Sequence, residues 1–336
     1  MSIKLVDDEY LWDRFVNESP YGMLFHRWKF LQILEKYSGF RLYPFGIFRG
    51  DEPVCLFPLF HRTYGGLRMV FSPPPGVCVP YLGPVMSPLY DDLRQRKKES
   101  YLNTIIGEVQ GQIAKFAPHY MSFNAVPEFE DVRPFQWEGY DIGVSHTYVL
   151  DIRGSLDSVW EGFDANCRKG IRTCGRQQVT LKQTDDARKF YDITRARFEG
   201  MGMNCPLPGA DYLTEIVRTF PDNARMYFLY AGDEIAYIAL NTEYKGRLMF
   251  WLGEINVRTD MAGNEYAKWE FIKDAKARGF TEVELEGATM KQLCQFKSRF
   301  NPALKHSYII YRKDLLGSVA EWAYKNFRMK KSIVRT

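Results

Sequence analysis

The sequence predicts a mixed α/β protein built from two domains. The chain has 336 residues, which is long for a single hydrophobic core, so two domains are the expected number. Hydrophobic residues make up 46% of the chain and charged residues 26%, the balance of an ordinary globular protein. Helix and strand patterns alternate, and the order of the second half recurs in weaker form in the first. We therefore expect an internal duplication of one α/β unit.

In the first half, a helical pattern precedes short β-rich runs. Apolar residues recur at helical spacing from Leu24 to Leu34, and Gly39 follows as a stop signal. The predicted elements are helices at 24–37 and 101–116 and strands at 42–48, 54–60 and 120–126. Residues 71–88 contain six prolines and two glycines, which predicts an irregular loop or a sheet edge.

The second half shows a longer alternation that includes a three-stranded meander. The predicted helices are 156–176, 187–200, 211–220 and 265–278, and the predicted strands are 147–152, 179–183, 225–231, 234–244, 247–253 and 281–285. Gly232-Asp233 and Lys245-Gly246 supply the turns of the meander. We place the domain boundary before Thr147, which gives domains at 1–146 and 147–312 and a C-terminal segment at 313–336.

Composition argues against several classes of protein. The longest apolar stretches fall short of the roughly 18 residues of a spanning helix, and the acidic start of the chain lacks the apolar core of a signal peptide, so we expect a cytoplasmic protein. The six cysteines form no C-x-x-C pair, so neither a metal nor a disulfide framework is predicted. The net charge of +4 is too small to indicate a DNA-binding protein.

Three stretches of the second half resemble the FemAB-like acyltransferases of the GNAT superfamily. They are WEGFDANCRKGIRTCGRQQV at 160–179, AGNEYAKWEFIKDAKARGF at 262–280 and QFKSRFNP at 295–302, with a looser likeness in SPYGMLFHRWKFLQIL at 19–34. The resemblance implies two GNAT-like domains in tandem and acyl transfer. This sequence departs from the family where Asn301 and Pro302 follow the FKSRF word, and where a glutamate, Glu284 or Glu286, replaces the usual aspartate. The segment 195–220 is also too short for the long arm that some members use to bind tRNA.

The basic helix carries the first candidate binding residues. Arg168 and Arg172 lie four residues apart, so they share one helical face and could hold a phosphate, with Lys169 widening the basic surface. The resemblance places this helix at the border of the site, where a donor or acceptor bearing a diphosphate would bind. It also gives Lys297 of the FKSRF word a role in substrate binding. The alternatives are a solvated basic face and an ordinary surface lysine.

A second candidate site lies at the start of the helix predicted at 265–278. Backbone N–H groups at a helix N-terminus stabilise anions, and in GNAT folds the pyrophosphate of coenzyme A binds there. Only Gly263 remains of the usual glycine-rich loop, with Asn264 beside it as an N-cap. A plain helix cap is the alternative to this cofactor-binding role.

Acyl transfer to an amine needs a group that takes the amine proton. Glu254 follows the last meander strand, close to where the superfamily places such a base, and Glu286 lies near the next strand. We rank these two glutamates first as catalytic residues. Glu243 and Glu284 are further candidates on neighbouring strands, and a merely solubilising glutamate is the alternative for each.

The sequence thus predicts an N-acyltransferase. The expected donor is acyl-coenzyme A or aminoacyl-tRNA, and the expected acceptor is an amine of a small-molecule or lipid-linked precursor of the cell envelope, a polysaccharide or a peptide. A C-terminal stripe of apolar residues from Leu315 to Phe327, followed by a basic tail, predicts either packing on the protein or a peripheral membrane contact. The rival hypothesis is an inactive GNAT-like scaffold that binds a glycan or protein through residues 71–88.

Overall fold

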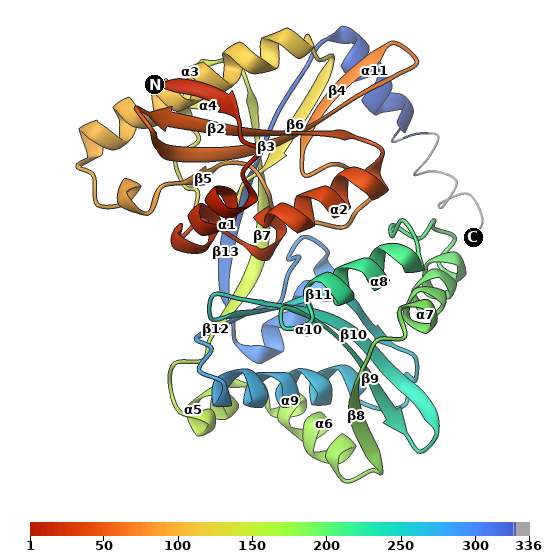
Figure 1. Cartoon of the computed structure of the whole chain (residues 1–336). Coiled ribbons are helices and arrows are strands. Elements are labelled where there is room, and N and C mark those ends of the chain that lie inside the picture. The colour runs from red at the N-terminus through yellow and green to blue at the C-terminus, as the bar shows by residue number, and fades with distance from the viewer. Residues whose placement is uncertain (325, 327–336) are drawn as a thin grey trace. The chain divides into compact units, whose positions relative to one another are not determined.

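The chain forms two units, and the first of them is built from two separate segments of the sequence. This computed structural model describes residues 1–324 and 326 (Figure 1). The first unit contains Met1–Val144 together with the described residues from Ser307 onward, and the second contains Ser145–His306. The division lies two residues before the expected boundary at Thr147. The residues from Ser307, which we expected in the second domain and a separate C-terminal segment, instead return to the first unit.

The first unit is a mixed sheet with helices packed on it. Its strands run in the order β1-β2-β3-β4-β6-β13, antiparallel except for the parallel pair β4–β6, while β5 pairs with β3. The strands are β1 (Ser2–Leu5), β2 (Arg41–Arg49), β3 (Glu52–Tyr64), β4 (Leu67–Ser72), β5 (Val85–Met86), β6 (Tyr120–Asn124) and β13 (Ala303–Lys313). The helices are α1 (Glu9–Glu18), η1 (Leu24–His26), α2 (Trp28–Ser38), η2 (Pro88–Tyr90), α3 (Gln95–Phe116), α4 (Arg133–Trp137) and α11 (Leu315–Ala323).

The proline-rich segment of this unit is largely irregular, as predicted. It leaves the sheet after β4 and rejoins it at an isolated bridge between Leu82 and Ala125 and at the two-residue strand β5. The buried hydroxyl of Ser72 fixes it by donating to the carbonyl of Pro58 at 2.7 Å and accepting from the amide of Gly83 at 2.9 Å. These bonds give hydrogen-bond partners to a carbonyl and an amide of two buried residues.

The second unit has the helix–meander–helix arrangement expected from the sequence. Its strands run in the order β7-β12-β11-β10-β9-β8, with β11–β12 parallel and the other pairs antiparallel. The strands are β7 (Asp141–Asp151), which enters from the first unit, β8 (Val179–Thr184), β9 (Ala224–Ala231), β10 (Glu234–Tyr244), β11 (Arg247–Asn256) and β12 (Glu282–Glu284). The helices are α5 (Leu156–Gly162), α6 (Ala165–Gly175), α7 (Ala187–Gly200), α8 (Ala210–Thr219), α9 (Gly263–Ala277), α10 (Lys291–Lys297) and η3 (Ser298–Phe300).

The single helix expected over 156–176 is two helices. Phe163 and Asp164 are extended, and the Asp164 carboxylate caps α6 by accepting from the amide of Asn166 at 2.8 Å. An aspartate that caps a new helix competes with continuation of the old one. The break turns the Phe163 ring into the core, where it lies 5.2 Å from the ring of Phe300.

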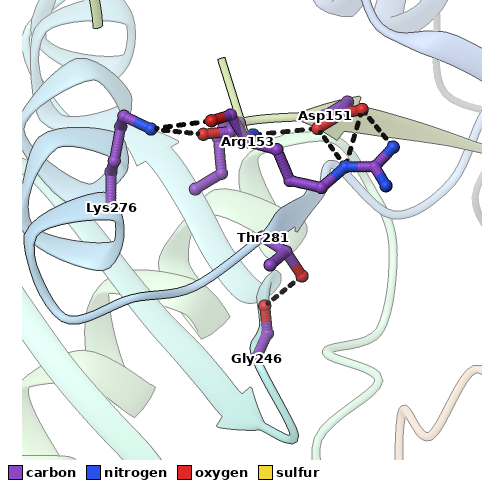
Figure 2. A network of polar contacts seen from close by, with 6 residues as sticks. Asp151, Arg153, Gly246, Lys276 and Thr281 are labelled. Atoms are coloured by element: carbon purple, nitrogen blue, oxygen red, sulfur yellow. Dashed lines mark hydrogen bonds and ion pairs between the residues drawn. The ribbon is translucent and has the colours of Figure 1, made fainter. Parts of the chain in front are cut away.

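The C-terminal end of α9 forms hydrogen bonds with residues in or next to two strands. The Lys276 ammonium donates to the carbonyls of Ile152 at 2.8 Å and Arg153 at 3.4 Å, just beyond β7, as Figure 2 shows. Arg278 makes two short hydrogen bonds, of 2.5 and 2.6 Å, to the buried carboxylate of Glu243 in β10. These contacts hold α9 against the sheet, and so fix the residues on its first turns.

Candidate functional site

The candidate site of the second unit begins at an irregularity in β11. Ile255 pairs with Ile238 of β10 and Gly253 pairs with Ala239, so Glu254 is an extra residue between two ladder pairs. Gly253 and Glu254 both have positive φ, of 82° and 53°. A Cβ at position 253 would lie 2.7 Å from the ring of Phe190 and 3.1 Å from the carbonyl oxygen of Ile238. Glycine is therefore required there, and the bulge turns the Glu254 side chain out of the regular alternation.

The carboxylate of Glu254 is held by two buried donors. The Tyr237 hydroxyl donates to Oε1 at 2.6 Å, and the Lys268 ammonium forms an ion pair with Oε2. The Lys268 side chain is 0% exposed and the Glu254 side chain is 21% exposed, so only the glutamate of this ion pair reaches solvent. The Lys268 nitrogen also lies 3.9 Å from the centre of the Phe250 ring, a cation–π contact.

Burial shifts the proton affinities of both donors. It lowers the pKa of Lys268 well below the ordinary value, and the positive charge of Lys297 acts in the same direction. Burial raises the pKa of Tyr237 well above its ordinary value, and the charge of Glu265 adds to this effect. Tyr237 therefore stays a hydrogen-bond donor, whereas Lys268 gives up its proton more readily than a surface lysine.

The N-terminus of α9 lies beside this group. Asn264 Nδ2 donates to the backbone carbonyl of Glu254 at 3.5 Å, and Gly263 is close enough to Tyr237 that an added Cβ would lie 3.5 Å from the Cβ of that residue. The N-cap residue, Ala262, supplies no side-chain hydrogen bond to the first turn. The side-chain oxygens of Asn256 and Asn264 are buried and have no hydrogen-bond partner. This end of α9 therefore combines an N-terminus without a side-chain cap with two amide oxygens that are free to accept a hydrogen bond.

Glu286 and Lys297 form a second pair near Lys268. The Lys297 ammonium donates to the backbone carbonyls of Glu286 and Gly287, the latter at 3.0 Å, rather than to the Glu286 carboxylate. Burial lowers the pKa of Lys297, opposed by the charge of Glu286, and burial raises the pKa of Glu286, opposed by Lys297. The structure thus brings five of the predicted residues into one neighbourhood: Glu254, Gly263, Asn264, Glu286 and Lys297.

The basic residues of α6 point to a different neighbour. Arg168 donates to the carboxylate and the backbone carbonyl of Glu161 in α5, both at 2.8 Å, and the Arg172 guanidinium lies 5.2 Å from the centre of the Trp160 ring. Lys169 is exposed. The two arginines therefore pack on α5. Their guanidinium groups are not arranged to bind a diphosphate, the role that the sequence predicted for them.

Two residues of the site were absent from the predicted set, Lys268 and Tyr237. The sequence did hold a signal for the lysine. Lys268 lies four residues after Asn264 and four before Ile272, on the face of α9 that also carries the buried Phe271. A lysine on the apolar face of a predicted helix is rare unless its charge is paired, which makes it a candidate for a functional role. Tyr237 carried no comparable signal because aromatic residues are ordinary in a buried strand.

Comparison with known proteins assigns the fold. Residues 162–298 match the family model described as an acetyltransferase (GNAT) domain. Matching solved structures include FemX, with 12% identity over 92% of this chain and 97% of that chain at a TM-score of 0.70. They also include L-PGS from Bacillus licheniformis, with 15% identity over 98% and 99% at a TM-score of 0.58. A search of curated proteins finds no match.

A third solved structure bears directly on the tandem arrangement. It is a tandem GNAT protein from the clavulanic acid biosynthesis pathway, solved without AcCoA, with 11% identity over 93% of this chain and 97% of that chain at a TM-score of 0.52. The chain therefore has the fold of a tandem GNAT protein, which confirms the predicted fold class, and its match to FemX agrees with the FemAB-like resemblance. The description of the matching family model indicates acyl transfer as the general class of activity for residues 162–298.

Proposed function

We propose that this protein transfers an acyl group from acyl-coenzyme A to an amine, with Glu254 as the proton acceptor. The observation that carries the proposal is the placement of Glu254. A bulge turns it out of β11, two buried donors orient its carboxylate, and the start of α9 lies beside it. Transfer from a phosphate-bearing thioester to an amine requires a base and a site that binds the phosphates. Here a carboxylate lies beside a helix N-terminus that can bind an anion.

The first turn of α9 is the proposed binding site for the donor. The backbone N–H groups of Gly263, Asn264 and Glu265 precede the first intrahelical hydrogen bonds and have no side-chain cap, so they can donate to a pyrophosphate. The free amide oxygens of Asn256 and Asn264 could accept from amide groups of a pantetheine arm. The residues present therefore fit coenzyme A, although the acidic Glu265 in the first turn opposes an anion.

Glu254 is the proposed general base. As the amine nitrogen attacks the thioester carbonyl, one N–H proton passes to the carboxylate, the C–S bond breaks, and the thiolate leaves and is protonated from the site. Hydrogen bonds from Tyr237 and Lys268 fix the carboxylate in position, and because 21% of its side chain is exposed an acceptor can reach it. Glu286, whose pKa is raised by burial, is the second carboxylate able to serve as the base.

Aminoacyl-tRNA is the alternative donor. Only residues 201–209 connect α7 and α8, so the described structure has no long arm at that place. The arginines of α6 contact α5, and the net charge of the chain is only +4. These observations favour coenzyme A over a polyanion as large as tRNA. The acceptor we propose is an amine on a cell-envelope, polysaccharide or peptide precursor, free or lipid-linked.

Calorimetric titration of the intact protein tests the donor. Acetyl-coenzyme A, coenzyme A, charged tRNA and uncharged tRNA are titrated separately into the wild type and into Asn264→Asp. The added carboxylate at the α9 N-terminus should weaken coenzyme A binding about five- to tenfold, because it repels the pyrophosphate and competes for the same N–H groups. Ala210→Asp, which places an acid on the first turn of α8, is the matched control and should bind as the wild type does.

The outcomes separate the hypotheses. Saturable binding of coenzyme A that weakens only in Asn264→Asp supports the proposed donor. Binding of tRNA alone would move the protein to the aminoacyl transferases. Binding of neither donor would contradict the proposal and favour the inactive scaffold. Turnover with a panel of soluble amines, lost in Glu254→Gln and retained in Glu234→Gln on the exposed end of β10, tests the catalytic role.

A further inference from the structure

Helix α11 packs with its small face inward and its large apolar face outward. Its one buried residue is Gly317, whereas Leu315 is 82% exposed and Trp322 is 60% exposed, with Leu316 and Val319 exposed between them. Leu315, Val319 and Trp322 are spaced by four and three residues, so they lie on one stripe. An amphipathic helix on a protein core normally shows the opposite orientation.

Specific contacts hold this orientation. The Asp314 carboxylate caps α11 by accepting from the amide of Gly317 at 2.8 Å, and its second oxygen lies 2.7 Å from Nδ1 of His119. A Cβ on Gly317 would lie 2.0 Å from the carbonyl oxygen of His119, so the helix approaches the body of the unit as closely as only glycine permits. Lys313 adds an ion pair to Glu321 at 2.5 Å. The fold therefore anchors α11 by its glycine face and leaves the leucine and tryptophan stripe outside.

The sequence that follows α11 is positively charged and would complement a negatively charged surface. Five basic residues follow Trp322, and no acidic residue occurs from Trp322 to Thr336; the basic residues are Lys325, Arg328, Lys330, Lys331 and Arg335. They and Phe327, the last residue of the predicted stripe, lie outside the residues that the structure describes. Their sequence alone shows a cationic segment continuous with an exposed apolar helix.

We propose that α11 binds the surface of an anionic lipid bilayer, and that the basic residues after it in the sequence strengthen this binding. The leucines and Val319 would enter the boundary between headgroups and acyl chains, Trp322 would lie at the interface, and the basic residues would contact anionic headgroups. The proposed contact is with the bilayer surface. No helix in the described part of the chain is long and apolar enough to cross a bilayer. The apolar stripe and the basic run together match an anionic bilayer, which has an apolar interior beneath a layer of negatively charged headgroups.

Vesicle flotation of the full chain tests this proposal. The probes are vesicles of phosphatidylcholine alone and vesicles that also contain phosphatidylglycerol. The test variant is Leu315→Gln/Trp322→Gln. It replaces two exposed apolar residues by glutamine, which is polar and favours the helical conformation. Its matched control is Leu89→Gln/Trp137→Gln, which changes a leucine and a tryptophan of the same unit that are 67% and 61% exposed.

We expect the wild type and the control to bind the anionic vesicles and to bind phosphatidylcholine weakly. The test variant should partition at least about 30-fold less, because two large apolar side chains no longer enter the bilayer. Lys330→Gln/Lys331→Gln should also weaken partition to anionic vesicles about 30-fold, because each lost charge reduces it roughly fivefold or more. Added salt should reduce the difference between this variant and the wild type, because salt screens the attraction to the headgroups.

Three results would overturn the proposal. The first is equal partition of the test variant and the wild type, and the second is failure of the wild type to bind anionic vesicles. The third is a wild-type dimer that binds no vesicles and is dissociated by Leu315→Gln/Trp322→Gln. That result would make the stripe an interface between copies of the chain. Acyl transfer to a soluble amine should be the same in the test variant and the wild type. Failure of the membrane proposal is thereby distinct from failure of the proposed function.

Discussion

The unequal burial of Glu254 and Lys268 leads to a prediction about their single and double variants. Lys268 is 0% exposed, whereas the carboxylate that pairs with it is 21% exposed and also bonded to Tyr237. In Lys268→Met the remaining carboxylate can hydrate, and the cost of burying a charged ammonium disappears. In Glu254→Gln the buried ammonium remains without a counter-ion. The two halves of one ion pair should therefore differ in their effect on stability.

The expected magnitudes follow from the loss of a charged partner in a buried site. Glu254→Gln should lower the free energy of unfolding by about 2 kcal/mol, since glutamine keeps one acceptor for Lys268 but not the charge. For a unit of this size that corresponds to a melting point lower by about 4–8 °C. Lys268→Met should stay within about 1 kcal/mol of the wild type. The double variant should recover most of the loss, because no charge is then left buried.

The pH dependence has a defined sign. A lysine with a lowered pKa holds fewer protons in the folded state than in the unfolded state, so stability rises with pH from the folded-state pKa up to the ordinary lysine value of about 10.5. Loss of the Glu254 charge lowers the pKa of Lys268 further, so the defect of Glu254→Gln should shrink as pH rises from the folded-state pKa of Lys268 in the variant to that in the wild type. Thermal unfolding at several pH values, followed by circular dichroism, measures all four proteins. The reasoning fails if Glu254→Gln is as stable as Lys268→Met, or if the double variant is no more stable than Glu254→Gln.

Two further predictions concern the residues that position the site. Arg278→Met should lower the free energy of unfolding by about 3 kcal/mol, because it removes two short hydrogen bonds from the buried carboxylate of Glu243. Arg188→Met, at an exposed ion pair of α7, is the control and should cost less than about 1 kcal/mol in the same denaturant titration. Gly253→Ala should cost about 2–3 kcal/mol and reduce acyl transfer, because a methyl group there meets an aromatic ring and the bulge must shift. Gly232→Ala has positive φ but open space, so it should cost only about 1 kcal/mol and leave transfer unchanged; equal effects of the two alanines would refute the packing argument.

Much of the second unit was predictable because its signals are local. The meander over β9, β10 and β11 follows from β-rich runs with glycine turns, and α9 follows from helical spacing that ends before Gly279. The sequence words at residues 160–179 and 262–280 are sufficient to suggest the GNAT fold. Glu254 and Asn264 were proposed as site residues because each lies at the end of a predicted element, where superfamily sites occur.

Other features depend on contacts between residues far apart in sequence. Strand β13 was not predicted, and its return to the first unit beside β6 cannot be read from its own residues. The direction in which Arg168 and Arg172 point was decided by the break at Asp164, which folds α5 back against α6. Periodicity specifies which face of an element is apolar but not what covers that face.

The sequence by itself determined the class of fold, the extent of most helices and strands, and the carboxylates that could serve as a base. Only the tertiary structure decided that Lys268 and Tyr237 hold Glu254, and that α11 turns its glycine inward and its leucines outward. The physical reason is the same in both cases. Hydrogen-bond patterns and side-chain spacing act within a few residues, whereas the pairing of buried charges and the choice of packed face are settled by neighbours that only the folded chain brings together.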